Sequence, residues 1–572
     1  MNSLVMWIGG LLAAVLAALF AVHLFVDWNG YRGVIEEEAS RILGRDVRVG
    51  GNINVRLLPT PYLRFEKLRI ADISEGASEP LFRADAFTLW LSVPPLLKGD
   101  LEVRRMALEK PVVTLKLASD GVGNWASLGI ETRRLPFVPQ NVALQSVEIG
   151  GGAIVLHHAS AGELARLDDM SGEFAAESLA GPYKLTADAR WNGAMRELRL
   201  ATGAMDAAGT LRFKGSARTR TGAGERAGVS AQLDGAVVDL TGRARVEGQV
   251  ALQMPLPELP AATVHAAVGA PPEASPAAGS SGSAPMPASR APAPSGDAAP
   301  LKPSGPVTLD IKGRLLADAR QLTGADLVAS VDNVGQPQLA TAAASLAWGS
   351  PPRLDFSAAS RWLDFDRLAP SSGRASPVET LGAMARGLLA ALPAGAIVQG
   401  NLGIEQITLG GEAVSGLDIA VKRDAAGPLR IERAFAELPA GGRVSLDGRL
   451  DQGDSALALD GRVTVAGPSL ERLARWAAPG TLAGQLAPDG AFSLDTAVGI
   501  SAGVLNLKDA RGKLNGHAFT AAAAVPLSGT GSLSIAFDAD VIESNWLWKG
   551  GLDRRGFLAW LDRLSQLASA TP

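Results

Sequence analysis

The chain of 572 residues contains no cysteine, and only 5% of its residues are aromatic. Disulfides, thiolate metal sites and cysteine nucleophiles are therefore excluded. Charge is nearly balanced, with a net value of -4 at pH 7. A chain with no excess of basic residues has no electrostatic field for a polyanion, so we expect no nucleic-acid partner.

Motifs for catalysis are missing as well. The sequence has no Walker loop, no dinucleotide-binding fingerprint and no HExxH zinc motif. His157 and His158 are adjacent, so on a strand they would point to opposite faces and could not share one metal ion. Gly453-Asp454-Ser455 lies between two alternating segments, where a hairpin turn explains it better than a nucleophile. We expect no catalytic residue, no metal, no cofactor and no enzymatic activity.

One long apolar run is present near the N-terminus. Residues 4–26 carry no charge, and as a helix they would extend about 35 Å, enough to cross a hydrocarbon core of about 30 Å. A cleaved signal peptide would have a shorter run preceded by Lys or Arg. The sequence therefore predicts an uncleaved, single-pass transmembrane helix preceded by residues 1–3. The predicted anchor residues are Trp7, Leu12, Leu16, Phe20 and Trp28.

The side of the membrane on which the body lies is not decided by charge. Arg32, Arg41 and Arg45 follow the apolar run and no basic residue precedes it. The positive-inside rule applies to short loops, whereas large domains cross largely regardless of charge. Orientation therefore stays open at this point.

The rest of the chain is predicted to be mainly β. Residues 29–44 have helical spacing, and Gly44 is placed to end that helix. Apolar residues then alternate with polar ones through 45–255 and again through 307–540, as in half-buried strands. Three short helical stretches interrupt the second region, at 362–368, 378–392 and 469–477. The predicted fold is an elongated, curved antiparallel sheet; a closed β-sandwich or solenoid is the alternative.

Two further segments differ in composition. Residues 256–306 are rich in Pro, Ala, Ser and Gly, with few large apolar groups, and predict a disordered linker. Residues 541–572 form a tail with an amphipathic stretch. Its apolar face consists of Phe557, Trp560, Leu561 and Leu564. That face would meet the β body, a membrane surface or a partner.

Several motifs in residues 30–130 carry a resemblance to a known family. The segments are 44–53 (GRDVRVGGNI), 58–61 (LPTP), 92–99 (SVPPLLKG), 110–115 (KPVVTL) and 120–125 (DGVGNW). Their order, directly after a lone apolar helix, resembles the AsmA family. Residues 394–540, including 441–450, resemble its C-terminal part more loosely. Residues 45–255 and 307–540 would then be its two β regions.

The resemblance implies an inner-membrane anchor, with residues 1–3 at the cytoplasmic end and the body in the periplasm of a Gram-negative envelope. It implies a role in outer-membrane assembly or in moving phospholipid along an apolar β groove, with an outer-membrane or periplasmic protein as a second partner. The alternative is a tethered scaffold with a closed β core and no lipid cargo. The candidate groove-lining residues are Ile53, Val55, Leu57, Leu63, Phe65, Leu68, Ile70, Val113, Leu115, Leu117, Leu402, Ile404, Leu417 and Ile419.

Overall fold

A computed structural model describes residues 27–541 of the protein with gaps. The gaps are 57–59, 73–78, 93–102, 127–143, 179–180, 221–227, 241, 256–307, 333–336, 369–375, 426, 453–456, 478, 480–488, 502–503, 527–533 and 540. The predicted transmembrane helix at 4–26, the linker at 256–306 and the tail beyond 541 lie outside the described residues. Within the described residues, no helix has the length and apolar character needed to cross a membrane.

Twenty-six strands make up most of the described chain. Their bounds are β1 Val47–Val49, β2 Ile53–Arg56, β3 Tyr62–Ile70, β4 Phe82–Leu91, β5 Val103–Glu109, β6 Val112–Leu117, β7 Leu144–His158, β8 Gly162–Ala176, β9 Tyr183–Trp191, β10 Ala194–Thr202, β11 Leu211–Thr219, β12 Ser230–Val238 and β13 Arg245–Pro255. After residue 307 come β14 Thr308–Ala317, β15 Gln321–Asp332, β16 Pro337–Ala347, β17 Arg353–Asp364, β18 Ile397–Leu409, β19 Glu412–Arg423, β20 Leu429–Leu438, β21 Gly442–Gln452, β22 Leu457–Gly467, β23 Phe492–Ser501, β24 Val504–Leu514, β25 His517–Pro526 and β26 Ser534–Ala539.

The described helices are short. They are η1 Trp28–Tyr31, α2 Arg32–Leu43, α4 Phe365–Leu368, α5 Pro377–Ala391, η2 Pro439–Gly441 and α6 Leu470–Ala477. Gly44 ends α2 with a φ of 63°, a left-handed conformation that costs glycine little. At α5, Ser376 and Glu379 form a capping box, which satisfies two backbone N–H groups at the helix start.

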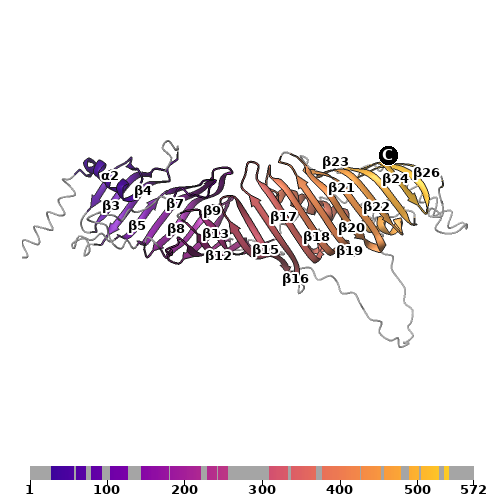
Figure 1. The fold of residues 1–572 in the computed structure, drawn as a ribbon, viewed down its shortest axis with the longest axis horizontal. Helices are drawn as coiled ribbons and strands as arrows, with labels where there is room; N and C mark the ends of the chain where they lie inside the picture. The colour runs from indigo at the N-terminus through magenta and orange to yellow at the C-terminus, as the bar shows by residue number, and fades with distance from the viewer. Residues whose placement is uncertain are drawn as a thin grey trace, which may run out of the picture.

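All the strands belong to one sheet, drawn as a long curved ribbon in Figure 1. Neighbours along the chain are mostly antiparallel neighbours in the sheet, which confirms the predicted mainly β, curved sheet with few short helices. Two joins depart from the antiparallel pattern. β7 runs parallel to β5 and β6, and β18 runs parallel to β17. Parallel neighbours need a crossover, which α4 and α5 occupy between β17 and β18.

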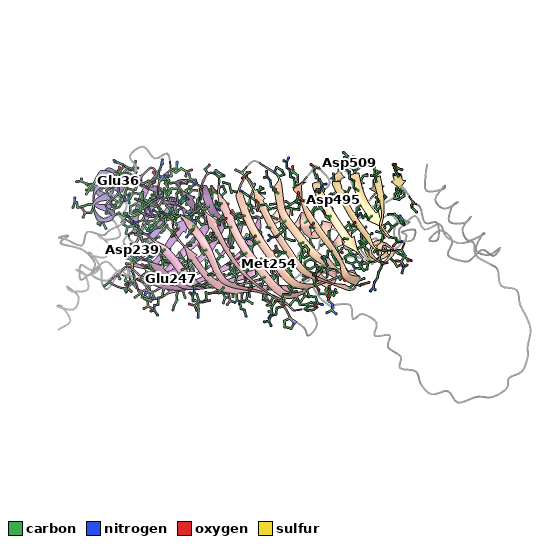
Figure 2. All side chains as sticks on the ribbon, turned by 45° about the vertical axis from the view of Figure 1, so that its right-hand side comes forward. Glu36, Asp239, Glu247, Met254, Asp495 and Asp509 are labelled. Atoms are coloured by element: carbon green, nitrogen blue, oxygen red, sulfur yellow. The ribbon has the colours of Figure 1, made fainter. Side chains whose placement is uncertain are left out.

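β-bulges interrupt the ladders at intervals. The pairing register shifts at Asp169 in β8, at Asp326 in β15 and at Asp509 in β24, and each of these residues has a φ of 51°. Of the three, Asp509 is labelled in Figure 2. An aspartate tolerates this left-handed conformation better than most side chains. Because a bulge bends its strand and increases the local twist, these positions curve the sheet.

The curvature brings together turns that are far apart in sequence. Val122, after β6, forms an antiparallel bridge with Arg243, in the turn between β12 and β13. Trp125 Nε1 donates to the Leu240 carbonyl oxygen at 3.0 Å. The buried His158, at the end of β7, has Nε2 2.7 Å from the Ala319 carbonyl oxygen, in the turn after β14. Turns that lie on opposite borders of the sheet, and are separated along it by several strands between β7 and β14, are therefore in contact.

Candidate functional site

One face of the sheet carries an unbroken series of small and apolar side chains; we call it the inner face. Directly paired residues in a sheet lie on the same face. From β2 to β19 the pairs run Ile53, Phe65, Phe87, Leu108, Ile149, Gly172, Ala187, Leu198, Ala217, Ala231, Leu252, Ile311, Ala329, Ala340, Ser360, Ile404 and Leu417. The inner face is thus continuous through most of the described sheet.

The opposite, outer face is polar and exposed. The Arg64 side chain on β3 reaches across β4 to Glu109 on β5 at 2.8 Å. Lys214 pairs with Asp234 at 2.9 Å, and Arg462 pairs with Asp495 at 2.7 Å. The Arg64 guanidinium donates to Glu109 and holds the pKa of that carboxyl below its ordinary value. Exposed ion pairs of this kind contribute little to stability individually. They show which face of the ribbon meets water.

The described helices cover the inner face in two places. At the N-terminal end, α2 residues Ile35 and Ala39 pack on the buried Val47, Val49 and Ile53. Farther along, Phe365 of α4, Met384 of α5 and Trp476 of α6 pack on the cluster around Ile404 and Ile407. Among the described helices, none packs on the inner face between β8 and β16. There the large inner side chains are mostly half-buried; Leu200, Leu233 and Val250 are examples.

The N-terminal candidate residues lie together. Ile53 pairs with Phe65 and Val55 with Leu63, so these four side chains share the inner face. Leu68 and Ile70 pack in the same cluster beneath α2. Val113, Leu115 and Leu117 are half-buried on β6, in register with Ile154, Leu156 and His158 of β7. Leu57 lies outside the described residues.

The C-terminal candidates also form direct pairs, Leu402 with Ile419 and Ile404 with Leu417. Helices lie over them: Leu402, Ile404 and Leu417 belong to the cluster with Phe365, and Ile419 packs with Ala385 and Leu389 of α5. Ile404 is only 2% exposed. In this structure these four side chains are core residues of a sheet–helix contact.

The anchor residues Trp7, Leu12, Leu16 and Phe20 lie outside the described residues, as do Phe557, Trp560, Leu561 and Leu564 of the tail. Trp28 is described. It lies in η1 and packs against the cluster of Val47 and Ile53, with its ring 6.1 Å from that of Tyr31. The predicted membrane anchor and amphipathic tail remain predictions.

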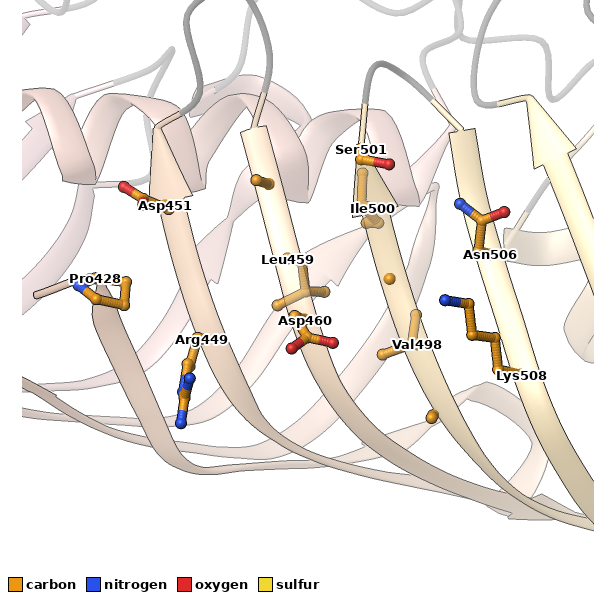
Figure 3. Close-up of a pocket in the computed structure, with 13 residues that line it drawn as sticks. Pro428, Arg449, Asp451, Leu459, Asp460, Val498, Ile500, Ser501, Asn506 and Lys508 are labelled. Atoms are coloured by element: carbon orange, nitrogen blue, oxygen red, sulfur yellow. The ribbon is translucent and has the colours of Figure 1, made fainter.

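A depression of about 400 Å³ lies over β21 to β24 (Figure 3). Arg449, Asp460, Gly499 and Asn506 are successive cross-strand partners in it. Lys508 lies on the neighbouring part of β24, and the side chain missing at Gly499 leaves the space. The positive charges of Arg449 and Lys508 are balanced by the negative charges of Asp451 and Asp460. The depression therefore favours neither anionic nor cationic ligands.

Titratable groups gather nowhere in the described chain as a metal site would require. His157 Nε2 lies 3.9 Å from Glu79, while the His158 ring is used in the contact with Ala319. Asp364 is a carboxylate whose pKa is raised above its ordinary value by burial. Its Oδ1 accepts a hydrogen bond from the Arg367 backbone N–H at 3.2 Å. This is a cap at the start of α4. The expectation that the protein is not an enzyme stays a prediction.

The candidate groove residues include none between β8 and β16, the part of the inner face on which no described helix packs. The signal was present: residues 183–191, 211–219 and 245–255 all alternate between apolar or small and polar residues. Alternation alone does not tell whether another layer covers the apolar face.

Comparisons with known proteins find a relationship at the N-terminal end. Residues 2–143 match the model of the AsmA family. Over 112 residues the chain is 29% identical to "Protein AsmA" of Escherichia coli (strain K12), a match that covers 20% of this chain and 18% of that protein. No solved structure matches. The N-terminal part of the chain, residues 2–143, is therefore similar to the AsmA family.

Proposed function

We propose that this protein is a membrane-anchored periplasmic carrier that holds the acyl chains of phospholipid on the inner face of its sheet and moves them between the inner and outer membranes. The observation that carries the proposal is the inner face between β8 and β16. It is continuous, mainly apolar and not covered by any described helix, and a large apolar surface that a protein leaves uncovered commonly contacts a ligand, a membrane or a partner.

The energetics favour acyl chains as that ligand. Each methylene moved from water onto an apolar surface gains about 0.8 kcal/mol, so a chain of ordinary length would bind with a large favourable term. Contact of this kind is non-directional and needs no fixed pocket. A long ribbon with one apolar face therefore suits transport along its length, and no catalytic group is required.

The anchor and compartment belong to the same proposal. The apolar run at 4–26 supplies an inner-membrane attachment, and the similarity of residues 2–143 to the AsmA family supports an envelope location with the body in the periplasm. An outer-membrane or periplasmic protein would be needed at the far end of the ribbon. There the last described strand, β26, exposes Ile535 at 59% and Phe537 at 50%.

A second candidate is a tethered scaffold for outer-membrane assembly. It is favoured by the helices over β17 to β22, where Val398 and Ile404 are almost inaccessible and the face is a closed core. The scaffold hypothesis requires no lipid bound to the sheet, whereas the carrier hypothesis requires phospholipid bound to the inner face.

Site-specific photo-crosslinking distinguishes the two. A benzophenone amino acid would replace Leu233, which faces inward on β12, or its neighbour Gln232, which faces outward and is exposed. In cells labelled with radioactive phosphate, the carrier predicts phospholipid capture at position 233 and little at 232. Equal capture at both positions, or none at either, contradicts the carrier.

A further inference from the structure

The inner face between β9 and β16 holds one charged side chain among its described residues, Arg196 on β10. Its direct partners are Ala189 on β9 and Thr219 on β11, which lie on the same face. Ala187, Leu198 and Ala217 form the adjacent row. A lone cation in such surroundings requires an explanation, because an incompletely solvated charge is costly unless it is paired.

Neighbouring groups fix the guanidinium in place. Arg196 Nη1 donates to Thr219 Oγ1 at 2.9 Å, and that hydroxyl donates in turn to the Val229 carbonyl at 3.2 Å. The Arg196 Cζ atom lies 5.4 Å from the centre of the Trp191 ring, close enough for a cation–π contact. These contacts hold the half-buried side chain against the inner face.

The same guanidinium lacks an anion. No carboxylate of the described residues forms an ion pair with Arg196, although arginines on the outer face pair repeatedly. The buried Nε has no hydrogen-bond partner. Asp188, Asp169 and Glu197 lie nearby, but they pair with Arg220, Arg190 and Arg199.

We propose that Arg196, positioned by Thr219 and Trp191, binds the phosphate of a phospholipid headgroup while the acyl chains lie on the adjacent apolar rows. A guanidinium presents parallel N–H donors that match two phosphate oxygens, and the bond is strong where water is scarce. The inference rests on the proposed lipid carrier and adds a selective step: lipids with a phosphate pause at β10, and lipids without one do not.

The test compares two fluorescent lipids that differ only in the headgroup, phosphatidylglycerol and diacylglycerol, bound to the full-length protein. Arg196→Gln should weaken phosphatidylglycerol binding by roughly tenfold and leave diacylglycerol binding unchanged. Arg196→Lys keeps the charge but not the paired donors, so it should restore only part of the affinity. The matched control is Arg199→Gln, on the outer face of the same strand, which should change neither affinity.

Other results overturn the inference. If Arg196→Gln weakens the binding of both lipids equally, Arg196 is a structural residue. If Arg196→Gln leaves phosphatidylglycerol binding unchanged, there is no phosphate site at Arg196. In both cases the carrier proposal still stands as long as the wild type binds diacylglycerol. Inorganic phosphate that binds the lipid-free protein through Arg196 and displaces phosphatidylglycerol would assign the site to a free anion. If the wild type binds neither lipid, the proposed function itself fails. Circular dichroism of each variant separates these effects from unfolding.

Discussion

Arg45 donates a hydrogen bond from Nη2 to the backbone carbonyl of Asn124 at 2.9 Å. The two residues are 79 positions apart, and each belongs to one of the motifs that resemble the AsmA family. Arg45 is 8% exposed and Asn124 is 7% exposed. Asn124 also accepts from the Lys116 backbone N–H and donates to Asp72. The motifs thus build one buried polar contact that holds the start of the sheet to the loop after β6.

Arg45→Ala should destabilise the N-terminal part of the sheet by about 2–3 kcal/mol, because it removes a charge-assisted bond and leaves a buried carbonyl without its partner. Chemical denaturation followed by circular dichroism measures the loss, and faster hydrogen exchange at residues 114–126 would locate it. Arg41→Ala is the control, since Arg41 makes only exposed ion pairs within α2. A change below about 0.5 kcal/mol for Arg45→Ala would show that the contact is dispensable.

Glycine pairs in the sheet give a second prediction. A Cβ added to Gly235 would lie 2.1 Å from the Glu247 carbonyl oxygen, opposite Gly248, whereas one added to Gly215 would find its nearest neighbour at 3.8 Å. Gly235→Ala should therefore cost about 1–3 kcal/mol through displaced backbone. Gly215→Ala should be neutral or slightly stabilising, since alanine lowers the entropy of the unfolded chain. Denaturation midpoints compare the two, and similar midpoints would contradict the close strand approach at Gly235.

Asp364 makes stability depend on pH. Because burial raises its pKa in the folded protein, the folded state binds this proton more tightly than the unfolded state does. The cost of ionising Asp364 is fully present above the raised pKa. It disappears as the pH falls from there to the ordinary value near 3.8. Asp364→Asn should stabilise the protein at neutral pH relative to the wild type, with the difference shrinking toward pH 4. A difference that grows on acidification would reverse the assigned sign.

The contact between turns on opposite borders of the sheet can be tested by a disulfide. Ala244 N donates to the Gly121 carbonyl, so the bridged residues Val122 and Arg243 are a non-hydrogen-bonded pair, in which Cα atoms lie about 4.5 Å apart. That spacing suits a disulfide. Since the chain has no other cysteine, Val122→Cys combined with Arg243→Cys should form one intramolecular bond on mild oxidation, seen as a mobility shift that a reductant reverses. Free thiols after oxidation would mean that these turns do not meet.

Much of this architecture could be predicted from local pattern. Alternation at Ile53 and Val55, or at Leu402 and Ile404, depends only on side-chain direction along a strand, and it predicted strands that share a face. The parallel joins at β7 and β18 could not be predicted in this way, because pairing depends on crossovers and not on alternation. The bulges at Asp169, Asp326 and Asp509 and the inward position of Arg196 depend on register, which no single segment specifies. Whether a helix covers an apolar face is likewise a tertiary property.

The proposal that phospholipid binds the inner face is tested most directly by identifying the lipids that co-purify with the protein. Leu200 faces inward on β10 and the next residue, Ala201, faces outward. Leu200→Glu and Ala201→Glu therefore introduce the same charge on opposite faces. Mass spectrometry of the purified full-length protein should find phospholipid with the wild type and with Ala201→Glu, and about tenfold less with Leu200→Glu, because a carboxylate on the inner face opposes contact with acyl chains. Wild-type protein without phospholipid, or equal amounts in both variants, would contradict the account.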